Sequence, residues 1–249
     1  MKALSVLTVA AFAQAAEYGV DCSFPIHREL TCGDLLGDRQ SIYDHYMQGC
    51  RERYSADLCD EGEDMRLEMN LRQPQSMVNF TSAGFKKIRA PESLQKMLSK
   101  FWENNEDNDE EEVWGKGNIY TNHWESPTYM LHVQSSELGG GEELTQAIST
   151  VARENIEEWT GMRLRSTSVY GIRVYTEGAI LSPHVDRMPL VSSAIVNVAQ
   201  DVDEDWPIEV YDKFGKAVNI TMEPGDMVLY ESGSVLHGVS YTQRLFSDE

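Results

Sequence analysis

Basic residues are scarce in this sequence. It contains 21 Lys and Arg against 41 Asp and Glu, which gives a formal net charge of -20 at neutral pH. Because no stripe of Lys or Arg could follow a phosphate backbone, we expect neither nucleic acid nor an anionic membrane surface as a partner. The acidic excess has two interpretations. It steers a cationic substrate toward the protein, or it only keeps the protein in solution.

Long apolar runs are also absent. No segment approaches the roughly 18 consecutive apolar residues of a membrane span, so we expect no stable membrane insertion. At the start of the sequence, Lys2 precedes a short apolar stretch over 3–13, and the A-Q-A triplet at 13–15 is typical of a cleavage site. This pattern predicts a signal peptide over 1–16 and a place in the secretory pathway, in the endoplasmic reticulum lumen or secreted. An apolar N-terminal helix of the fold is the alternative.

Cysteine is rare, and all of it follows closely after the predicted cleavage site. An even, clustered set in a secreted chain predicts two disulfides, and the sequence leaves all three pairings open. A zinc site is the alternative, although no C-x-x-C pair occurs. The set defines a Cys-rich N-terminal region over 17–64 and consists of Cys22, Cys32, Cys50 and Cys59.

Several common binding motifs are missing as well. The three glycines at 139–141 are not followed by the Lys of a phosphate-binding loop. The acidic run at 106–112 lacks the glycine-containing pattern of an EF-hand, so we interpret it as a solvated loop, with calcium binding as the alternative. Neither internal repeats nor a Pro/Ser-rich linker divides the chain.

What the sequence does contain is two amphipathic helical patterns followed by many short strand patterns. The helices are predicted at 92–104 and 142–159, and weaker helical potential covers 38–54. A hairpin turn is predicted at 212–215. The expected strands are 167–175, 190–198, 208–211, 218–222 and 227–230.

This order of elements is typical of an α+β protein with a jelly-roll core and supporting helices. We therefore divide the rest of the chain into a helical or linker region over 65–117 and a main domain over 118–249.

The most informative motif is His184-Val185-Asp186, followed far downstream by His237. Side chains two residues apart on a strand point to the same face, so His184 and Asp186 are expected to point together. Two imidazoles and one carboxylate on one face of a metal ion leave the opposite face open, which is the ligand set of non-heme Fe(II) oxygenases. His123 and His132 are interpreted as surface or core residues, not as ligands.

Further residues around this motif extend the pattern. They are the run Y-G-I-R-V-Y at 170–175, Gly178, the run E-P-G-D-M-V-L-Y at 223–230, and Gly238. With them, the segment 170–238 resembles the Fe(II)/2-oxoglutarate-dependent dioxygenases, and within them the prolyl 4-hydroxylase-like branch.

The resemblance implies a fold, cofactors and a substrate. It implies a double-stranded β-helix with the metal ligands near its mouth, Fe(II), 2-oxoglutarate and ascorbate as cofactors, and a proline-containing polypeptide as substrate. Tyr175 lies nine residues before His184 and would reach a carboxylate of the cosubstrate; a packed strand aromatic is the alternative. The turn at 224–226 would lead into the strand that delivers the second histidine.

One position departs from the family pattern. The family places Lys or Arg about ten residues after the second histidine, whereas this chain has Ser247 there and only Arg244 as a basic residue after His237. A buried carboxylate needs a cationic partner, so we expect Arg244 to bind the cosubstrate, with Arg173 as its rival on the strand face of Tyr175. An exposed position of Arg244 on a frayed tail is the other alternative.

The same departure bears on activity. No closing strand is recognisable at 239–249, so we expect a dioxygenase-like domain that is truncated at its carboxyl end. The alternative to an active enzyme is a secreted binding or structural protein that keeps the barrel without catalysis.

Overall fold

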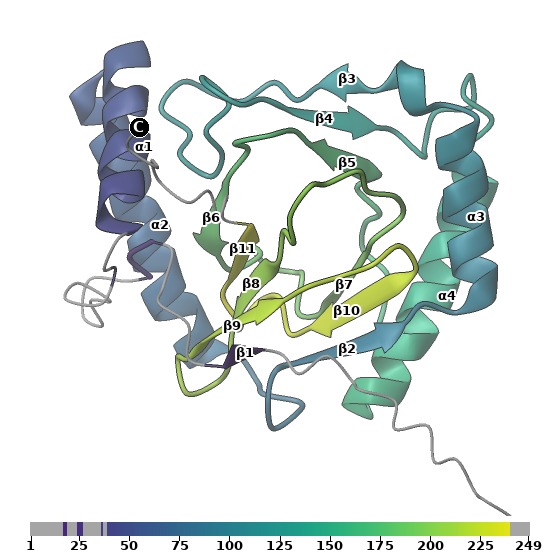
Figure 1. Ribbon diagram of the computed structural model, residues 1–249. Helices are drawn as coiled ribbons and strands as arrows, with labels where there is room; N and C mark the ends of the chain where they lie inside the picture. Colours follow the sequence, from purple (N-terminus) through teal and green to yellow (C-terminus); the bar gives the residue numbers. More distant parts are fainter. Residues whose placement is uncertain (1–16, 19–23, 27–35, 37–38, 240–249) are drawn as a thin grey trace, which may run out of the picture.

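Helices lie on two opposite sides of a group of antiparallel sheets in the computed structural model (Figure 1). The structure describes residues 17–18, 24–26, 36 and 39–239. The predicted signal peptide, Cys22, Cys32 and Arg244 lie outside the described residues.

The strands form three sheets whose pairings are antiparallel. The first sheet has the order β1 (Glu17–Tyr18), β9 (Ala217–Ile220), β8 (Ile208–Tyr211), β11 (His237–Val239) and β6 (Leu181–His184). The second has the order β2 (Phe85–Arg89), β10 (Asp226–Tyr230) and β7 (Ser193–Val196). The third has the order β3 (Glu110–Glu111), β4 (Thr128–Leu131) and β5 (Ile172–Tyr175).

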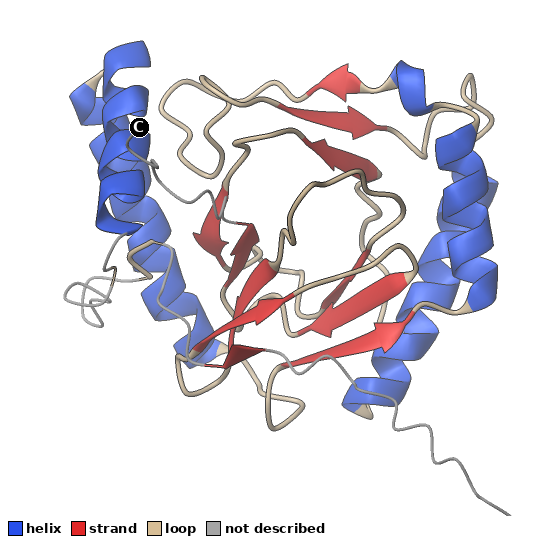
Figure 2. Ribbon diagram, in the orientation of Figure 1, coloured by secondary structure: helices blue, strands red, loops and turns tan. Residues whose placement is uncertain are grey.

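Two pairs of helices flank these sheets. Figure 2 shows α1 and α2 on one side of the strands and α3 and α4 on the opposite side. A short 3-10 helix, Glu106–Asn108, precedes β3. The bounds of the longer helices are Gln40–Arg53 for α1, Ala56–Ser76 for α2, Glu92–Glu103 for α3 and Glu142–Thr160 for α4.

Both amphipathic helices predicted from the sequence are confirmed. α3 and α4 begin at the predicted residues and end within one residue of the predicted bounds. Gly161 ends α4 with a positive φ of 70°, which a glycine adopts without strain. The predicted helical potential at 38–54 corresponds to α1. The part of α2 from Met65 onward falls within the region predicted as helix or linker, whereas its start at Ala56 was not predicted.

The strand predictions are confirmed at 208–211 and at the hairpin turn that follows, where Asp212 N donates to Lys216 O at 2.9 Å. The strand predicted at 227–230 is also confirmed, since β10 covers it and begins one residue earlier, and β9 corresponds to the strand predicted at 218–222 but ends two residues short of it. Two further strands are shorter than expected, because only part of each apolar segment has a ladder partner. The predicted 167–175 contains β5 only from Ile172, and the predicted 190–198 contains β7. The strand β2 was not predicted; it pairs with β10 from within the region assigned as helix or linker.

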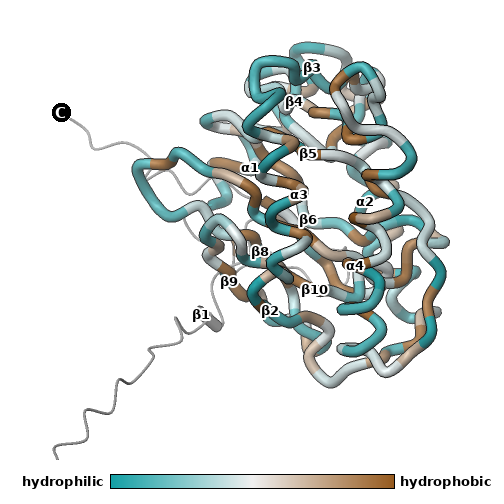
Figure 3. Tube along the Cα trace, turned by 90° about the vertical axis from the view of Figure 1, so that its right-hand side faces the viewer, coloured by the Kyte–Doolittle hydropathy of each residue, from teal (hydrophilic) through white to brown (hydrophobic). Residues whose placement is uncertain are grey.

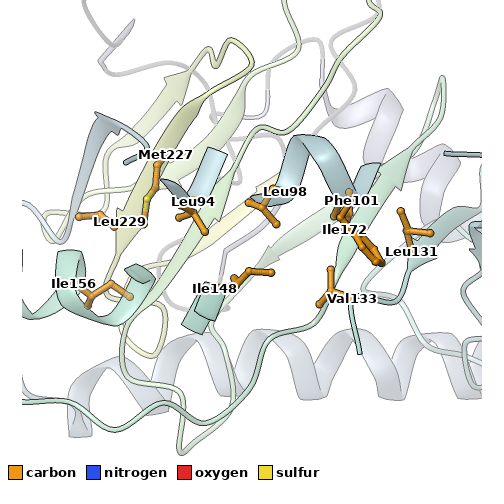
Figure 4. Close-up of a cluster of buried hydrophobic side chains, with 10 residues drawn as sticks. All are labelled: Leu94, Leu98, Phe101, Leu131, Val133, Ile148, Ile156, Ile172, Met227 and Leu229. Atoms are coloured by element: carbon orange, nitrogen blue, oxygen red, sulfur yellow. The ribbon is translucent and has the colours of Figure 1, made fainter. Parts of the chain in front are cut away.

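A core of buried hydrophobic side chains lies between α3, α4 and the sheets (Figure 4). α3 contributes one residue per turn to this core, which is the apolar stripe read from the sequence. Figure 3 shows hydrophilic segments along the outer turns around β3. The core residues are Leu94, Leu98, Phe101, Leu131, Val133, Ile148, Ile156, Ile172, Met227 and Leu229.

A disulfide joins α1 to α2. It connects Cys50 and Cys59, both fully buried, which makes this one of the pairings that the sequence left open. Ser55 lies between the two helices and caps α2 by accepting a hydrogen bond from Leu58 N at 3.3 Å. None of the described helices is long and apolar enough to cross a membrane.

We expect the double variant Cys50→Ala/Cys59→Ala to unfold more easily. The cross-link spans nine positions, and closing a loop of that size removes unfolded-state entropy worth about 2–3 kcal/mol. Urea denaturation of the oxidised protein and of the variant measures the difference. An unchanged free energy of unfolding would contradict a stabilising role for this bond.

Candidate metal centre

Two histidines face each other across neighbouring strands. His184 is the last residue of β6, His237 is the first residue of β11, and the antiparallel register pairs them directly. Directly opposed residues point to the same face of a sheet, so their rings lie side by side with centroids 4.4 Å apart. The His184 side chain is 14% exposed and that of His237 is 4% exposed.

Asp186 reaches the same point from outside the ladder. The expectation that His184 and Asp186 share one strand is wrong, because β6 ends at His184. Asp186 N donates instead to Ser232 O at 2.8 Å, which turns the chain toward the histidines. Asp186 Oδ1 lies 3.8 Å from His184 Nε2 and 3.7 Å from His237 Nε2.

The backbone orients both imidazoles in the same way. His184 Nδ1 lies 2.9 Å from Ser182 O, and His237 Nδ1 lies 3.0 Å from Val235 O. A carbonyl oxygen can only accept, so each Nδ1 carries the hydrogen and donates it. Each Nε2 therefore presents a lone pair toward Asp186, which is the tautomer that binds a metal ion.

The protonation states of the triad also suit a metal ion. Burial and the neighbouring His237 lower the pKa of His184 to about 3. Burial raises the pKa of Asp186, but the interactions of its carboxylate with the neighbouring His237 and His184 outweigh this effect and lower the pKa to about 2. At neutral pH the site thus offers a neutral His184 imidazole and an ionised Asp186 carboxylate, as metal ligation requires.

Two serines fix the remaining carboxylate oxygen. Ser193 Oγ donates to Asp186 Oδ2 at 3.2 Å and lies 2.7 Å from Ser232 Oγ. This contact turns Oδ1 toward the histidines. Partners of this kind orient metal ligands in proteins.

The donor set fits a divalent metal ion. One ligand atom from each of the three side chains lies within 4.8 Å of the others, so the predicted convergence is confirmed, while ligation itself stays a prediction. Three ligand atoms about 2.1 Å from one ion and on one face of it lie roughly 3 Å from one another, so binding would draw the three side chains closer together. Among the described residues, these three are the one group of His, Cys, Asp and Glu with such geometry. His123 and His132 are not part of it.

Tyr175, an expected cosubstrate residue, and Arg173, the rival of Arg244, are close to each other on β5. Burial lowers the pKa of Arg173, but the neighbouring Tyr175 and Glu112 outweigh it and hold the pKa above its ordinary value. Arg173 Nη2 donates to Glu112 Oε1 at 2.8 Å, and its Nε lies 2.7 Å from Oε2. The ring of Tyr175 packs against Trp206 with centroids 6.1 Å apart.

Some functional neighbours were not foreseen in the sequence. Glu112 was interpreted as part of a solvated acidic loop, yet its side chain is 13% exposed and pairs with Arg173. The turn at 224–226 does form, with Asp226 N donating to Glu223 O at 2.8 Å, but it leads into β10 and not into β11, which carries His237. Ser193 and Ser232 carry no sequence signal, because serines are common near turns.

Comparison with known proteins gives weak similarities. No protein-family model matches the chain. No curated protein matches it in sequence. Among solved structures, a crystal structure of a Pseudomonas putida prolyl-4-hydroxylase is similar at 15% identity and a TM-score of 0.45, and OsALKBH1 is similar at 11% identity and a TM-score of 0.36. Each alignment covers 66% of this chain and 88% of the other chain.

We expect His184→Ala and Asp186→Ala each to abolish binding of a divalent metal ion, because each removes one of three protein ligands. The loss should exceed the roughly 10–100-fold effect of removing an outer partner. Calorimetric titration with Mn(II) or anaerobic Fe(II) measures it. His132→Ala is the matched control, since His132 is exposed and outside the group. Retained affinity in both triad variants would exclude the site.

Proposed function

We propose that this chain is an Fe(II)- and 2-oxoglutarate-dependent dioxygenase. The observation that carries the proposal is the convergence of His184, Asp186 and His237 with both Nε2 lone pairs directed at Asp186. This ligand set leaves one face of the metal open, as binding of a bidentate cosubstrate and oxygen requires. The proposal includes a double-stranded β-helix, formed by the antiparallel sheets, with the triad at its mouth.

The residues around the triad would hold the metal and shield it. His184, Asp186 and His237 would bind one face of the ion and leave the other to small molecules. The ring of Tyr230 lies 4.5 Å from that of His237, and the ring of Tyr120 lies 5.5 Å from that of His184, so aromatic carbon covers both imidazoles. Bound Fe(II) would allow oxygen, the oxidant, to hydroxylate an unactivated C–H bond while 2-oxoglutarate is oxidised to succinate and carbon dioxide.

The cosubstrate would be held by Tyr175 and Arg244. The position of Tyr175 on β5 supports this role. Its neighbour on that strand, Arg173, is close enough to His184 for its charge to lower the pKa of this histidine. A guanidinium and a phenol hydroxyl together suit a carboxylate. Arg173 is the rival cation, although Glu112 already neutralises it.

We further propose a peptidyl substrate, proline or another residue, in the secretory pathway, with ascorbate as reductant. The buried disulfide Cys50–Cys59 supports an oxidising compartment, because such bonds are rare in reducing ones. The choice of proline depends on the resemblance of the segment 170–238 to the prolyl 4-hydroxylase-like branch.

A second candidate is a non-catalytic binding or structural protein that keeps the fold. One observation favours it: Arg173 lies beside Tyr175, but its guanidinium is engaged by both carboxylate oxygens of Glu112. A cation in this state binds a further carboxylate poorly unless Glu112 moves.

Turnover separates the two candidates. We expect the iron-loaded protein with 2-oxoglutarate, ascorbate and a proline-rich peptide to release succinate, and Asp186→Ala to release none. Succinate is measured by mass spectrometry beside peptide hydroxylation. Succinate without hydroxylated peptide supports an oxygenase with a different substrate. A protein that binds iron but converts no 2-oxoglutarate fits the non-catalytic candidate.

Substitutions at the proposed anchors test the cosubstrate site. We expect Tyr175→Phe and Arg244→Ala each to weaken 2-oxoglutarate binding about tenfold, since each removes a hydrogen bond to a charged group. Metal affinity, measured by calorimetry on the same variants, should not change.

Arg173 is tested by a double substitution, because removing Arg173 alone would leave the little-exposed Glu112 carboxylate without its cationic partner. We therefore compare Arg173→Met/Glu112→Gln with Arg244→Ala. A larger loss of 2-oxoglutarate affinity in the double variant would assign the anchor to Arg173 and not to Arg244.

A further inference from the structure

The helix α2 has a polar face that is buried. Glu63, Arg66 and Asn70 are 5%, 1% and 2% exposed, and Gln73 continues the same face one turn later. Buried helix faces are normally apolar, since each buried polar group needs a partner. The partners of this face are therefore informative.

The first partner is the residue before His184. Arg66 Nη1 donates to Pro183 O at 2.6 Å, and Asn70 Nδ2 donates to the same oxygen at 3.0 Å. Glu63 holds the guanidinium in place, with 2.6 Å between Arg66 Nη2 and Glu63 Oε1. The peptide group that leads directly into a triad histidine is thus held by two side chains of α2.

Arg66 and Asn70 also donate to two carbonyls away from the triad, Pro25 O at 2.8 Å and Ile26 O at 3.0 Å. The partners of Gln73 belong to the two segments around Asp186 and before His237. Gln73 Nε2 donates to Asp186 O at 2.6 Å and to Gly233 O at 2.8 Å. Asp186 follows β6, and Gly233 lies in the loop that precedes β11. One amide group therefore connects both segments that carry the triad.

Helix packing alone would not require this arrangement. Apolar residues at these positions would cover the barrel equally well, but the carbonyls of Pro183, Asp186 and Gly233 would lose hydrogen bonds from α2. Three donors of α2 instead meet the backbone within a few residues of all three triad side chains. This concentration indicates a role in the geometry of the site.

We infer that Gln73 is a positioning residue for the metal ligands, which it holds by bridging the backbone at Asp186 and Gly233. Arg66 and Asn70 complete the support at Pro183. The inference rests on the proposed metal site and adds to it a helix outside the barrel. It predicts that the affinity and the coordination geometry of the metal depend on a side chain that does not touch the ion.

The test compares four proteins with Co(II) as the probe. Gln73→Leu removes both hydrogen bonds, Gln73→Asn keeps the amide but is one methylene shorter, and Gln75→Leu changes an exposed residue of the same helix. We expect Gln73→Leu to weaken Co(II) binding roughly 10–100-fold, as for other outer partners, and Gln73→Asn to weaken it less. At saturating Co(II), the visible absorption bands should shift in the Gln73 variants and not in Gln75→Leu.

The outcomes separate a positioning role from a structural one. A lower melting temperature of Gln73→Leu with wild-type affinity and absorption bands would overturn the inference. If Gln73→Leu does not fold, the milder Gln73→Asn decides by the same two measurements. The variant His184→Ala distinguishes failure of the proposed metal site from failure of the positioning role. If it binds Co(II) like the wild type, the metal site itself is excluded. If it abolishes binding while both Gln73 variants bind normally, only the positioning role fails.

Discussion

The site depends on the register between β6 and β11, which places His237 opposite His184. β11 also pairs with β8, so His237 is held between two strands. Gly238 permits this approach, because a Cβ there would lie 2.5 Å from Leu181 O. The His-Gly pair in the sequence is therefore one structural unit: the histidine belongs to the triad, and the glycine allows its strand to approach β6 closely.

Part of the scarce positive charge pairs with carboxylates that are buried or little exposed. In a chain with a net charge of -20, Arg66 pairs with Glu63, Lys213 with Glu231, and Arg173 with Glu112. An ionised carboxylate inside a protein needs such a partner, so these cations are committed to the fold. The same requirement applies to any dicarboxylate cosubstrate near β5, which must either find a separate cation or share Arg173 with Glu112.

The sequence predicted the elements that show an apolar periodicity and the site whose residues are typical metal ligands. The stripe of Leu94, Leu98 and Phe101 predicted α3, and the histidines with Asp186 predicted a convergent group. α2 was not predicted as a distinct helix, because Arg66 and Asn70 occupy buried positions at which an amphipathic helix normally has apolar residues. The strand ends could not be predicted either, because they depend on partners that are distant in sequence, such as Ser232 for Asp186.

The end of β6 and the polar face of α2 have one physical cause. Among the described residues β6 is the last strand of its sheet, and its outer edge has only an isolated bridge between Leu181 and Thr121. The chain leaves the ladder after His184, which lets Asp186 reach the histidines. Carbonyl groups freed in this way are costly when buried without donors. Arg66, Asn70 and Gln73 supply the donors, and they bind backbone atoms that every residue type possesses. A sheet edge that carries a histidine of the triad is thus covered by a polar helix, and this relation is visible only once the two segments are brought together in space.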